Sequence, residues 1–347
     1  MARRVLIFVF LVILLALPVQ GMEFSAPAPP EWAEEYLPKE ADSFAEGLWN
    51  VLRAAAETIH PALHEGVKCC LRSLCAVLVL SMAAQFSQKK TALELAGVAA
   101  VAAILLEPSA ELMELGIGTA RELRSYGNLL MPVMASALAA SGGVTASTAL
   151  YVGTAAFDAV LSAAMTGLFV PMLKVYLALS IACRAVGEEL LSKLRDLIRW
   201  CMEWVLKLTL YLFTGYMTIT GVVSGTADAA AGKAAKIAIS GAVPVVGGIL
   251  SDATDAVLLS ASVLGSGAGI WGILTVIAIF CAPAFGIGVR YLLLKVTGTV
   301  ASSLGSGRSA ALIGDFAGAM GLLLALVSTQ AVLLLISSVC FLKGVAG

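Results

Sequence analysis

Charged residues are scarce in this sequence, which has 22 Lys or Arg and 23 Asp or Glu among 347 residues. This 13% share is roughly half that of an average soluble domain, and it supplies too little polar surface to cover a core in water. The formal net charge of -1 also lacks the basic excess with which nucleic-acid-binding proteins hold phosphates. The composition therefore excludes an ordinary soluble enzyme, a disordered tail and a nucleic-acid-binding protein.

Motifs for catalysis, cofactors and metals are also missing. The sequence has no GxxxxGK(S/T) loop, no HExxH motif and no CxxC pair. Its two histidines, His60 and His64, have Pro61 between them, and we interpret them as an outward-facing polar pair. Because both lie in the N-terminal segment, no Ser/His/Asp set is plausible. We expect no enzyme activity, no cofactor and no metal site, and we interpret the seven cysteines as small apolar packing residues.

Long runs without charge are what the sequence has instead. Three runs carry no charged residue and a fourth carries only Asp158 and Lys174; they are Leu208 to Ala227, Ala256 to Val289, Phe316 to Leu342 and, with the two charges, Leu129 to Cys183. A bilayer core is crossed by about 20 helical residues, because only a closed helix satisfies its backbone there without water. We predict an all-α polytopic membrane protein with roughly 6–10 membrane helices, including re-entrant or broken segments.

The first 21 residues are typical of a cleavable signal peptide, with an uncleaved anchor helix as the alternative. Two arginines precede the apolar run from Val5 to Leu17, and Pro18 then breaks the helix. Residues 22–68 follow as an exterior segment with nine acidic and three basic residues. Apolar residues at helical spacing in its second half predict a surface amphipathic helix. Residues 69–347 are predicted to form a multi-spanning membrane domain.

Lys and Arg residues in short connections indicate the topology. We predict a first span at 70–88, a second at 91–107 and an exterior loop over 107–124, which is rich in Glu and Arg. The basic stretches at Lys89–Lys90, 184–207 and 290–310 are predicted to be cytoplasmic. Within 184–207, an apolar stripe and two tryptophans predict an amphipathic helix that lies at the cytoplasmic interface.

The prolines indicate a weak internal duplication of residues 129–223 and 241–335. Pro132 and Pro171 are 39 residues apart, as are Pro244 and Pro283. The first copy opens with a short apolar segment that ends at Gly142 and Gly143, and Gly247 and Gly248 interrupt the second copy. Such segments at matching places predict re-entrant or broken helices that line a pathway. A pair of Pro-kinked ordinary spans is the alternative.

Four further residues are candidates for a role inside the membrane. Asp158 and Lys174 fall in an apolar run, and charge within a bilayer is costly enough to be a functional candidate by default. They could also lie at helix ends or pair with each other. Gly314 and Gly318 have the spacing that lets two membrane helices pack closely, so we predict a helix-packing site there.

The most distinctive stretch runs from Ile239 to Leu259. Ser251 can cap a helix whose first turn carries Asp252 and Asp255, both favourable against the helix dipole. The preceding run can bend sharply into or across the membrane through its Gly and Pro residues, and it contains Ser240, Gly241, Pro244, Gly247 and Gly248. This stretch resembles the signature segment of the stage III sporulation protein AE family. The order of the other segments fits that family over residues 44–342.

The resemblance implies a non-enzymatic component of the channel or secretion-like complex that joins mother cell and forespore after engulfment. It implies a location in the mother-cell membrane around the forespore. The implied partners are a separate ATPase, ring-forming and small membrane subunits from the same operon, and a forespore-side protein. Contact with membrane lipid and self-association are also expected. A secondary transporter that binds a small solute at Asp158 and the two broken segments is the alternative from a different class.

Overall fold

The computed structural model describes residues 26–34, 44–86, 90–140, 144–219, 267–304 and 307–346. Within these ranges the chain is helical and forms no strand, which confirms the predicted all-α class. The elements are α2 (Glu31–Glu34), α3 (Phe44–Glu57), α4 (Ile59–Phe86), α5 (Lys90–Ala140), α6 (Val144–Ala164), η1 (Met165–Phe169), α7 (Val170–Val186), α8 (Glu189–Ile219), α11 (Gly267–Ser303) and α12 (Gly307–Ala346). Because η1 is a short π-helical turn, α6, η1 and α7 form one continuous helical rod.

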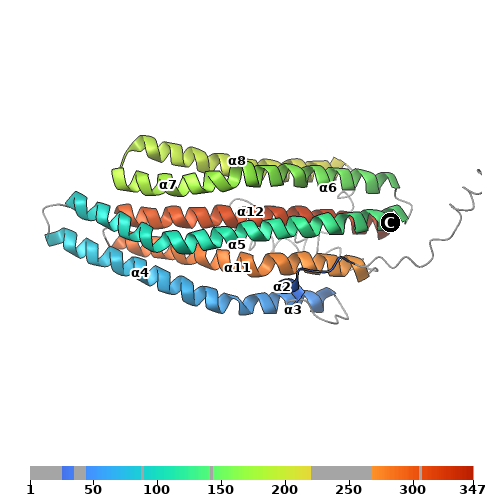
Figure 1. Cartoon of the computed structure of the whole chain (residues 1–347), viewed down its shortest axis with the longest axis horizontal. Helices are drawn as coiled ribbons and strands as arrows, with labels where there is room; N and C mark the ends of the chain where they lie inside the picture. The colour runs from blue at the N-terminus through green and yellow to red at the C-terminus, as the bar shows by residue number, and fades with distance from the viewer. Residues whose placement is uncertain are drawn as a thin grey trace, which may run out of the picture.

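The long helices lie side by side in an elongated bundle (Figure 1). α5 and α12 lie in the middle, with α6, α7 and α8 along one side and α3, α4 and α11 along the other. α5 and α12 run in parallel. A methyl group on Gly116 of α5 would lie 2.8 Å from Leu323 of α12, and one on Gly127 would lie 2.9 Å from Leu334. These contacts are equally spaced on both helices, so the pair keeps one register over three turns.

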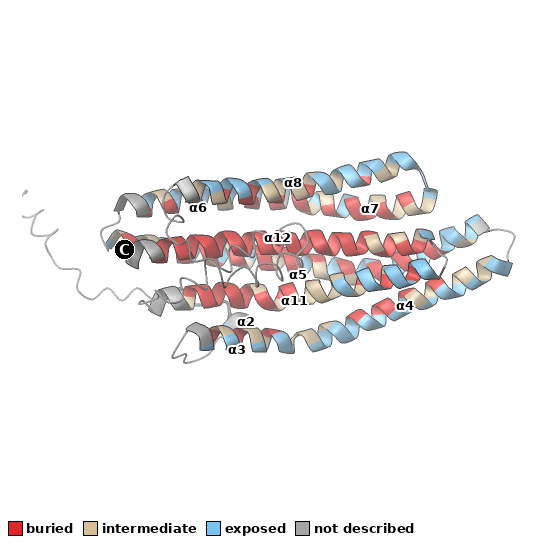
Figure 2. Cartoon of the chain, turned by 180° about the vertical axis from the view of Figure 1, so that it is seen from behind, coloured by how far each residue is buried: buried red, intermediate tan, exposed pale blue. Residues whose placement is uncertain are grey.

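α12 is the centre of the bundle. In its most apolar stretch 94% of the residues are buried inside the chain, against 22% for the span that contains α4 and 28% for α5. Figure 2 shows α12 buried along most of its length, whereas α4 is largely exposed. A helix that is apolar on every side is stable where neighbours cover all its faces. The surrounding helices therefore keep their outer apolar faces for contact with lipid or other subunits.

Five segments of the described chain are long and apolar enough to cross a membrane. They are Glu46–Phe86, Thr91–Ala140, Ser147–Val186, Trp271–Ser303 and Gly307–Leu342. These segments support a membrane protein. Because they come from the described residues alone, the predicted total of roughly 6–10 membrane helices stays a prediction.

The prediction that a short, separate segment opens at Leu129 is wrong. α5 is one helix of 51 residues that passes through both Pro108 and Pro132. Pro132 therefore does not open a short broken segment. Each proline removes one backbone hydrogen bond, but a helix packed among neighbours can continue through a proline when nearby groups satisfy the freed carbonyl.

The predicted exterior loop over residues 107–124 is also wrong, because this stretch is the middle of α5. Its charged residues Glu107, Glu111, Glu114 and Arg121 are exposed on the outer face. Met113, Ala120 and Leu123 on the opposite face are 5%, 1% and 0% exposed. The charges mark the solvated side of an amphipathic helix, and the packed apolar side keeps that helix continuous.

Three helix connections meet at one end of the bundle. α4 and α5 join between Phe86 and Lys90, α7 and α8 join at Gly187, and α11 and α12 join before Gly307. Gly187 ends α7 in the left-handed conformation, with φ at 82° and its N–H bonded to the Cys183 carbonyl at 2.8 Å. Arg308, at the start of α12, pairs with Glu94 near the start of α5 at 3.2 Å and lies against Gly187. The basic connections therefore share one end, as the predicted topology requires.

One assignment of sides is wrong, however. Glu65, Glu107 and Glu111 were expected outside and Arg290 inside, yet all four line one hollow between α4, α5 and α11. They cannot lie on opposite sides of a membrane. The reason is helix length: these charges occupy positions within long rods, not in the loops between short spans.

Residues 184–207 do not form a separate interfacial helix. They belong to the end of α7 and to α8, which continues to Ile219 and runs antiparallel to α7 (Figure 1). Met202 and Leu206 are fully buried, whereas Trp200 and Trp204 are more than half exposed, with ring centroids 5.8 Å apart. The stripe with the two tryptophans is thus the outer face of a bundle helix.

Several predictions lie outside the described residues. They are the signal peptide, Gly142 and Gly143, and the signature residues Ser240, Gly241, Pro244, Gly247, Gly248, Ser251, Asp252 and Asp255. The duplication stays a prediction, since its first copy is divided among α5, α6, α7 and α8 and the second begins outside the described part. The predicted boundary between residues 68 and 69 falls within α4.

Candidate functional site in the helix bundle

Asp158 lies on α6 and bonds to both central helices. Its Oδ2 accepts a hydrogen bond from Arg124 Nε of α5 at 3.0 Å, and its Oδ1 accepts one from Gln330 Nε2 of α12 at 2.7 Å. Arg124 also donates to the hydroxyl of Ser162, one turn along α6. The side chain of Asp158 is 15% exposed and that of Arg124 40%. We call Arg124, Asp158 and Gln330 the Asp158 cluster; it joins three helices through one carboxylate.

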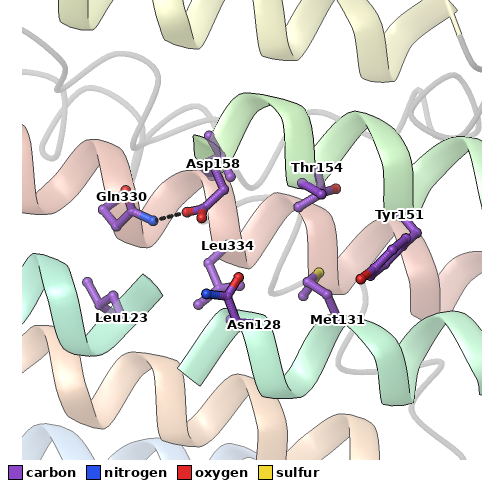
Figure 3. A pocket seen from close by; sticks show the side chains of 11 residues that line it. Leu123, Asn128, Met131, Tyr151, Thr154, Asp158, Gln330 and Leu334 are labelled. Carbon is purple, nitrogen blue, oxygen red and sulfur yellow. Dashed lines mark hydrogen bonds between the residues drawn. The ribbon is translucent and has the colours of Figure 1, made fainter. Parts of the chain in front are cut away.

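A cavity of about 40 Å³ adjoins the Asp158 cluster (Figure 3). Its other polar lining comes from Asn128, Tyr151 and Thr154. Thr154 donates a hydrogen bond to Ser337 at 3.1 Å, which holds α6 against α12 one turn from Asp158. At roughly 10–15 Å³ for each water, the cavity holds about three waters. It can hydrate the carboxylate but has no room for a larger solute.

The Asp158 cluster lies within the apolar part of the bundle. Gln330 belongs to the uncharged stretch of α12 that follows Asp315, about 22 Å further along the helix at 1.5 Å per residue. Ionised groups at such a depth are expensive unless they are paired. Arg124 supplies the opposite charge and Gln330 a further donor, so protein groups stabilise the carboxylate of Asp158 and it does not depend on water alone.

Asp158 is therefore paired with Arg124, and the alternative pairing with Lys174 is wrong. Lys174 is exposed on α7 and forms no ion pair within the described chain. Sequence reasoning missed Arg124 because it lay in the expected loop. The apolar spacing of Ala120, Leu123 and Leu130, all 1% exposed or less, could have placed Arg124 on the inner side of a helix.

A second cluster surrounds Asp315 on α12. Arg184 of α7 donates to both carboxylate oxygens, from Nε at 2.8 Å and Nη2 at 3.2 Å, and Arg195 of α8 donates from Nη1 at 2.9 Å. Asp315 and Arg195 are 9% and 8% exposed. The Tyr176 hydroxyl also donates to the backbone carbonyl of Asp315 at 3.3 Å. We call Arg184, Arg195 and Asp315 the Asp315 cluster; it ties the α7–α8 hairpin to the central helix.

The electrostatics keep the Asp315 cluster charged. Burial of the Arg195 guanidinium acts to lower its pKa, but the hydrogen bond to Asp196 and the charges of Asp315 and Asp196 outweigh burial and raise that pKa. Arg195 is therefore a permanent cation, and two guanidinium groups share one buried carboxylate. An arrangement of this kind resists separation of the helices, because removing one partner leaves a buried charge uncompensated.

Gly314 and Gly318 take part in packing within the chain. A methyl group on Gly298 of α11 would lie 3.5 Å from the Gly314 nitrogen and 3.5 Å from the Ala310 oxygen, so α11 and α12 approach closely there. A methyl group on Gly318 would lie 2.9 Å from the Tyr176 hydroxyl. The space at Gly314 itself is open. The close approach of α11 and α12 is thus made by Gly298 against the backbone of Ala310 and Gly314, whereas Gly318 lies against Tyr176 of α7.

The described chain contains no group of three or more His, Cys, Asp and Glu side chains placed to hold a metal ion. The geometry defines a helical membrane protein whose outer helices are held to a central helix by one buried and one partly buried ionic cluster. No solved structure is significantly similar to the chain.

Comparison with known sequences identifies the family. The profile of the stage III sporulation protein AE family matches residues 40–343, and the chain belongs to that family. The chain is also 23% identical over 185 residues to the stage III sporulation protein AE of Bacillus subtilis strain 168. That similarity covers 53% of this chain and 46% of the relative, so the matched part spans about half the relative's length. Membership implies a role in sporulation, and the family is not known as an enzyme.

Proposed function

We propose that this chain is an integral membrane component of the channel or secretion-like complex between mother cell and forespore, required for endospore formation after engulfment. Family membership over residues 40–343 is the observation that carries the proposal. Its location would be the mother-cell membrane that surrounds the forespore. Its partners would be the ATPase, the ring-forming and small membrane subunits of the same operon, and a forespore-side protein.

The packing of the bundle leaves apolar outer faces that are compatible with contacts to other subunits. The central helix α12 is covered by the chain's own helices, so the fold does not need a partner to bury its core. Large apolar side chains remain exposed on the outer helices, including Phe86 on α4, Leu129 on α5 and Tyr211 on α8. Lipid and neighbouring membrane subunits are the surfaces that such faces fit.

In the part of the chain that the structure describes, no observation favours a secondary transporter. A transported solute would need a cavity beside Asp158, and the cavity there has a volume of only about 40 Å³. Each oxygen of Asp158 also accepts a hydrogen bond already, one from Arg124 and one from Gln330, so a solute would have to compete with these contacts.

Deletion of the gene in the endospore-forming host tests the proposal. We expect sporulation to stop after engulfment, and the wild-type gene supplied in the mother cell should restore spore yield. A fluorescent fusion should then surround the engulfed forespore. Normal spore formation in the deletion strain would refute the proposal. So would a purified protein that binds none of the operon's products and moves a small solute into liposomes.

A further inference from the structure

A charged hollow between α4, α5 and α11 has no role in either cluster. It has a volume of about 370 Å³, and three acidic and three basic side chains line it: Glu65, Lys68, Arg72, Glu107, Glu111 and Arg290. None of these six forms an ion pair with any part of the chain that the structure describes. Helices α4 and α11 lie side by side along it, with α5 next to both. Five of the six are exposed, and Arg290 is the one that is half-buried.

The guanidinium of Arg290 indicates which kind of ligand the hollow could bind. Its Nη1 atom is buried and has no hydrogen-bond partner among the described residues. A buried donor without a partner is costly, and a guanidinium binds phosphate oxygens well through its planar set of donors. Lys68 and Arg72 line the same hollow and add two further cations. The arrangement fits a phosphate group.

A second hollow of about 400 Å³ continues from the first and shares Glu65, Pro108, Glu111 and Arg290 with it. Apart from these, its lining is mainly apolar and includes Ala62, Leu112, Leu115, Ala282 and Gly286. The combined space is therefore charged at one end and apolar at the other, which is the shape of an amphipathic ligand.

The two ends of this space are ordered along the bundle as the headgroup and acyl chains of a membrane lipid would be. Cys69, which lines the charged hollow, contacts the Ile104 carbonyl at 3.8 Å. Gly97 of α5 lies against Ser309 of α12, and since these helices run in parallel, Ile104 and Asp315 lie at similar heights. The residues of α5 that line only the second hollow begin at Leu112, about 12 Å further along α5 than Ile104 at 1.5 Å per residue. It therefore extends toward the part where α12 carries no charge.

We propose that this space binds one phospholipid, with its phosphate at Lys68, Arg72 and Arg290 and its acyl chains entering beside Leu112 and Gly286. Basic sites between membrane helices are known to bind lipid headgroups. Because the lining has equal numbers of acidic and basic residues, a zwitterionic headgroup such as phosphatidylethanolamine leaves the charges balanced. The carboxylates of Glu65, Glu107 and Glu111 then face its ammonium group. An anionic headgroup would leave one carboxylate without a cation.

Native mass spectrometry tests this proposal on the full chain, reconstituted in vesicles of equal phosphatidylethanolamine and phosphatidylglycerol and then released in mild detergent. We expect one retained phospholipid per chain, mostly phosphatidylethanolamine. Arg290→Gln should lower the retained fraction roughly tenfold, because it removes a charge-assisted phosphate contact. Lys295→Gln, an exposed residue of the same helix outside the hollow, should leave retention unchanged.

A second variant keeps the test decisive if Arg290→Gln fails to fold. A methyl group on Gly286 would meet nothing within 4 Å, so Gly286→Leu can fill the apolar end without straining the fold. It should also lower lipid retention roughly tenfold, while Gly215→Leu, equally open but on α8, should not. Excess inorganic phosphate should not release the lipid.

Three outcomes would overturn the lipid site: no retained lipid in the wild type, wild-type retention in both Arg290→Gln and Gly286→Leu, or a preference for phosphatidylglycerol. Release by inorganic phosphate would assign the hollow to a free anion instead. None of these results depends on spore formation, so the lipid site and the proposed function can fail separately.

Discussion

Asp315 and Arg195 are 120 residues apart in the chain, yet Arg195 Nη1 donates a hydrogen bond to Asp315 Oδ2 at 2.9 Å, with about a tenth of each side chain exposed. This contact joins α8 to the central helix, and Arg184 joins α7 to the same carboxylate. The α7–α8 hairpin thus depends on one acidic side chain for its ionic attachment to α12.

We first predict that Asp315→Asn destabilises the folded protein strongly. Asn keeps the shape of the side chain but removes the charge that compensates Arg184 and Arg195. The expected loss is about 3 kcal/mol, at the low end for a broken buried pair because Arg184 is 25% exposed and can reach water. Unfolding of the purified protein in detergent measures it.

Asp196→Asn is the matched control, since Asp196 pairs with Arg195 but is 63% exposed. A change of at most about 1 kcal/mol is expected there. Equal losses in the two variants would show that the Asp315 contact contributes no more than a surface ion pair.

The second prediction concerns the Asp158 cluster. Asp158→Asn should cost about 1–2 kcal/mol, because an ion pair becomes a hydrogen bond from the charged Arg124 to a neutral amide oxygen while Arg124 retains partial access to water. Lys174→Gln should change stability by less than about 0.5 kcal/mol, since Lys174 is exposed.

Combining Asp158→Asn with Arg124→Gln tests the pairing directly. The loss in the double variant should fall short of the sum of the two single losses by about 0.5 kcal/mol or more, because the residues share one bond. Additive losses would mean that Arg124 and Asp158 act independently.

The third prediction separates packing within the chain from packing between chains. Gly298→Leu should cost about 1–3 kcal/mol, because the larger side chain meets the backbone of α12 at Ala310 and Gly314. Gly314→Leu should leave the stability of the isolated chain nearly unchanged, since space is open there. If Gly314 lies at a contact with another subunit, Gly314→Leu should reduce co-purification of that subunit. Unchanged stability in Gly298→Leu would contradict the close helix approach.

The fourth prediction concerns topology and uses single cysteines in a variant without the seven native ones. Lys90→Cys and Lys193→Cys lie beside connections at the same end of the bundle, so both should react with reagents from the cytoplasmic side. Glu31→Cys should react from outside. Labelling of Lys90→Cys and Lys193→Cys from different sides would contradict the bundle, and labelling of both from outside would reverse the orientation.

The expected short spans and the observed long rods differ for a physical reason. Charge in a sequence marks where a helix meets water or a partner, and along α5 it does so on one face without ending the helix. Glu107 and Arg121 are therefore exposed on a helix that was expected to stop before them. Arg124 lies on the side of α5 that faces α6. The order of charged residues in the sequence does not show which of them face solvent and which face a neighbouring helix.

By itself the sequence determined the class of this protein. Scarce charge and long apolar runs suffice for an all-helical membrane protein, because backbone groups in the bilayer must be bonded internally and continuous apolar runs of about 20 residues do so as helices. The resemblance of the stretch around Pro244 was enough to identify the family. Only the tertiary structure decided which charges meet. Asp158 with Arg124, and Asp315 with Arg184 and Arg195, come from distant segments, and such pairs depend on the rotation and register of packed helices, which local sequence does not specify.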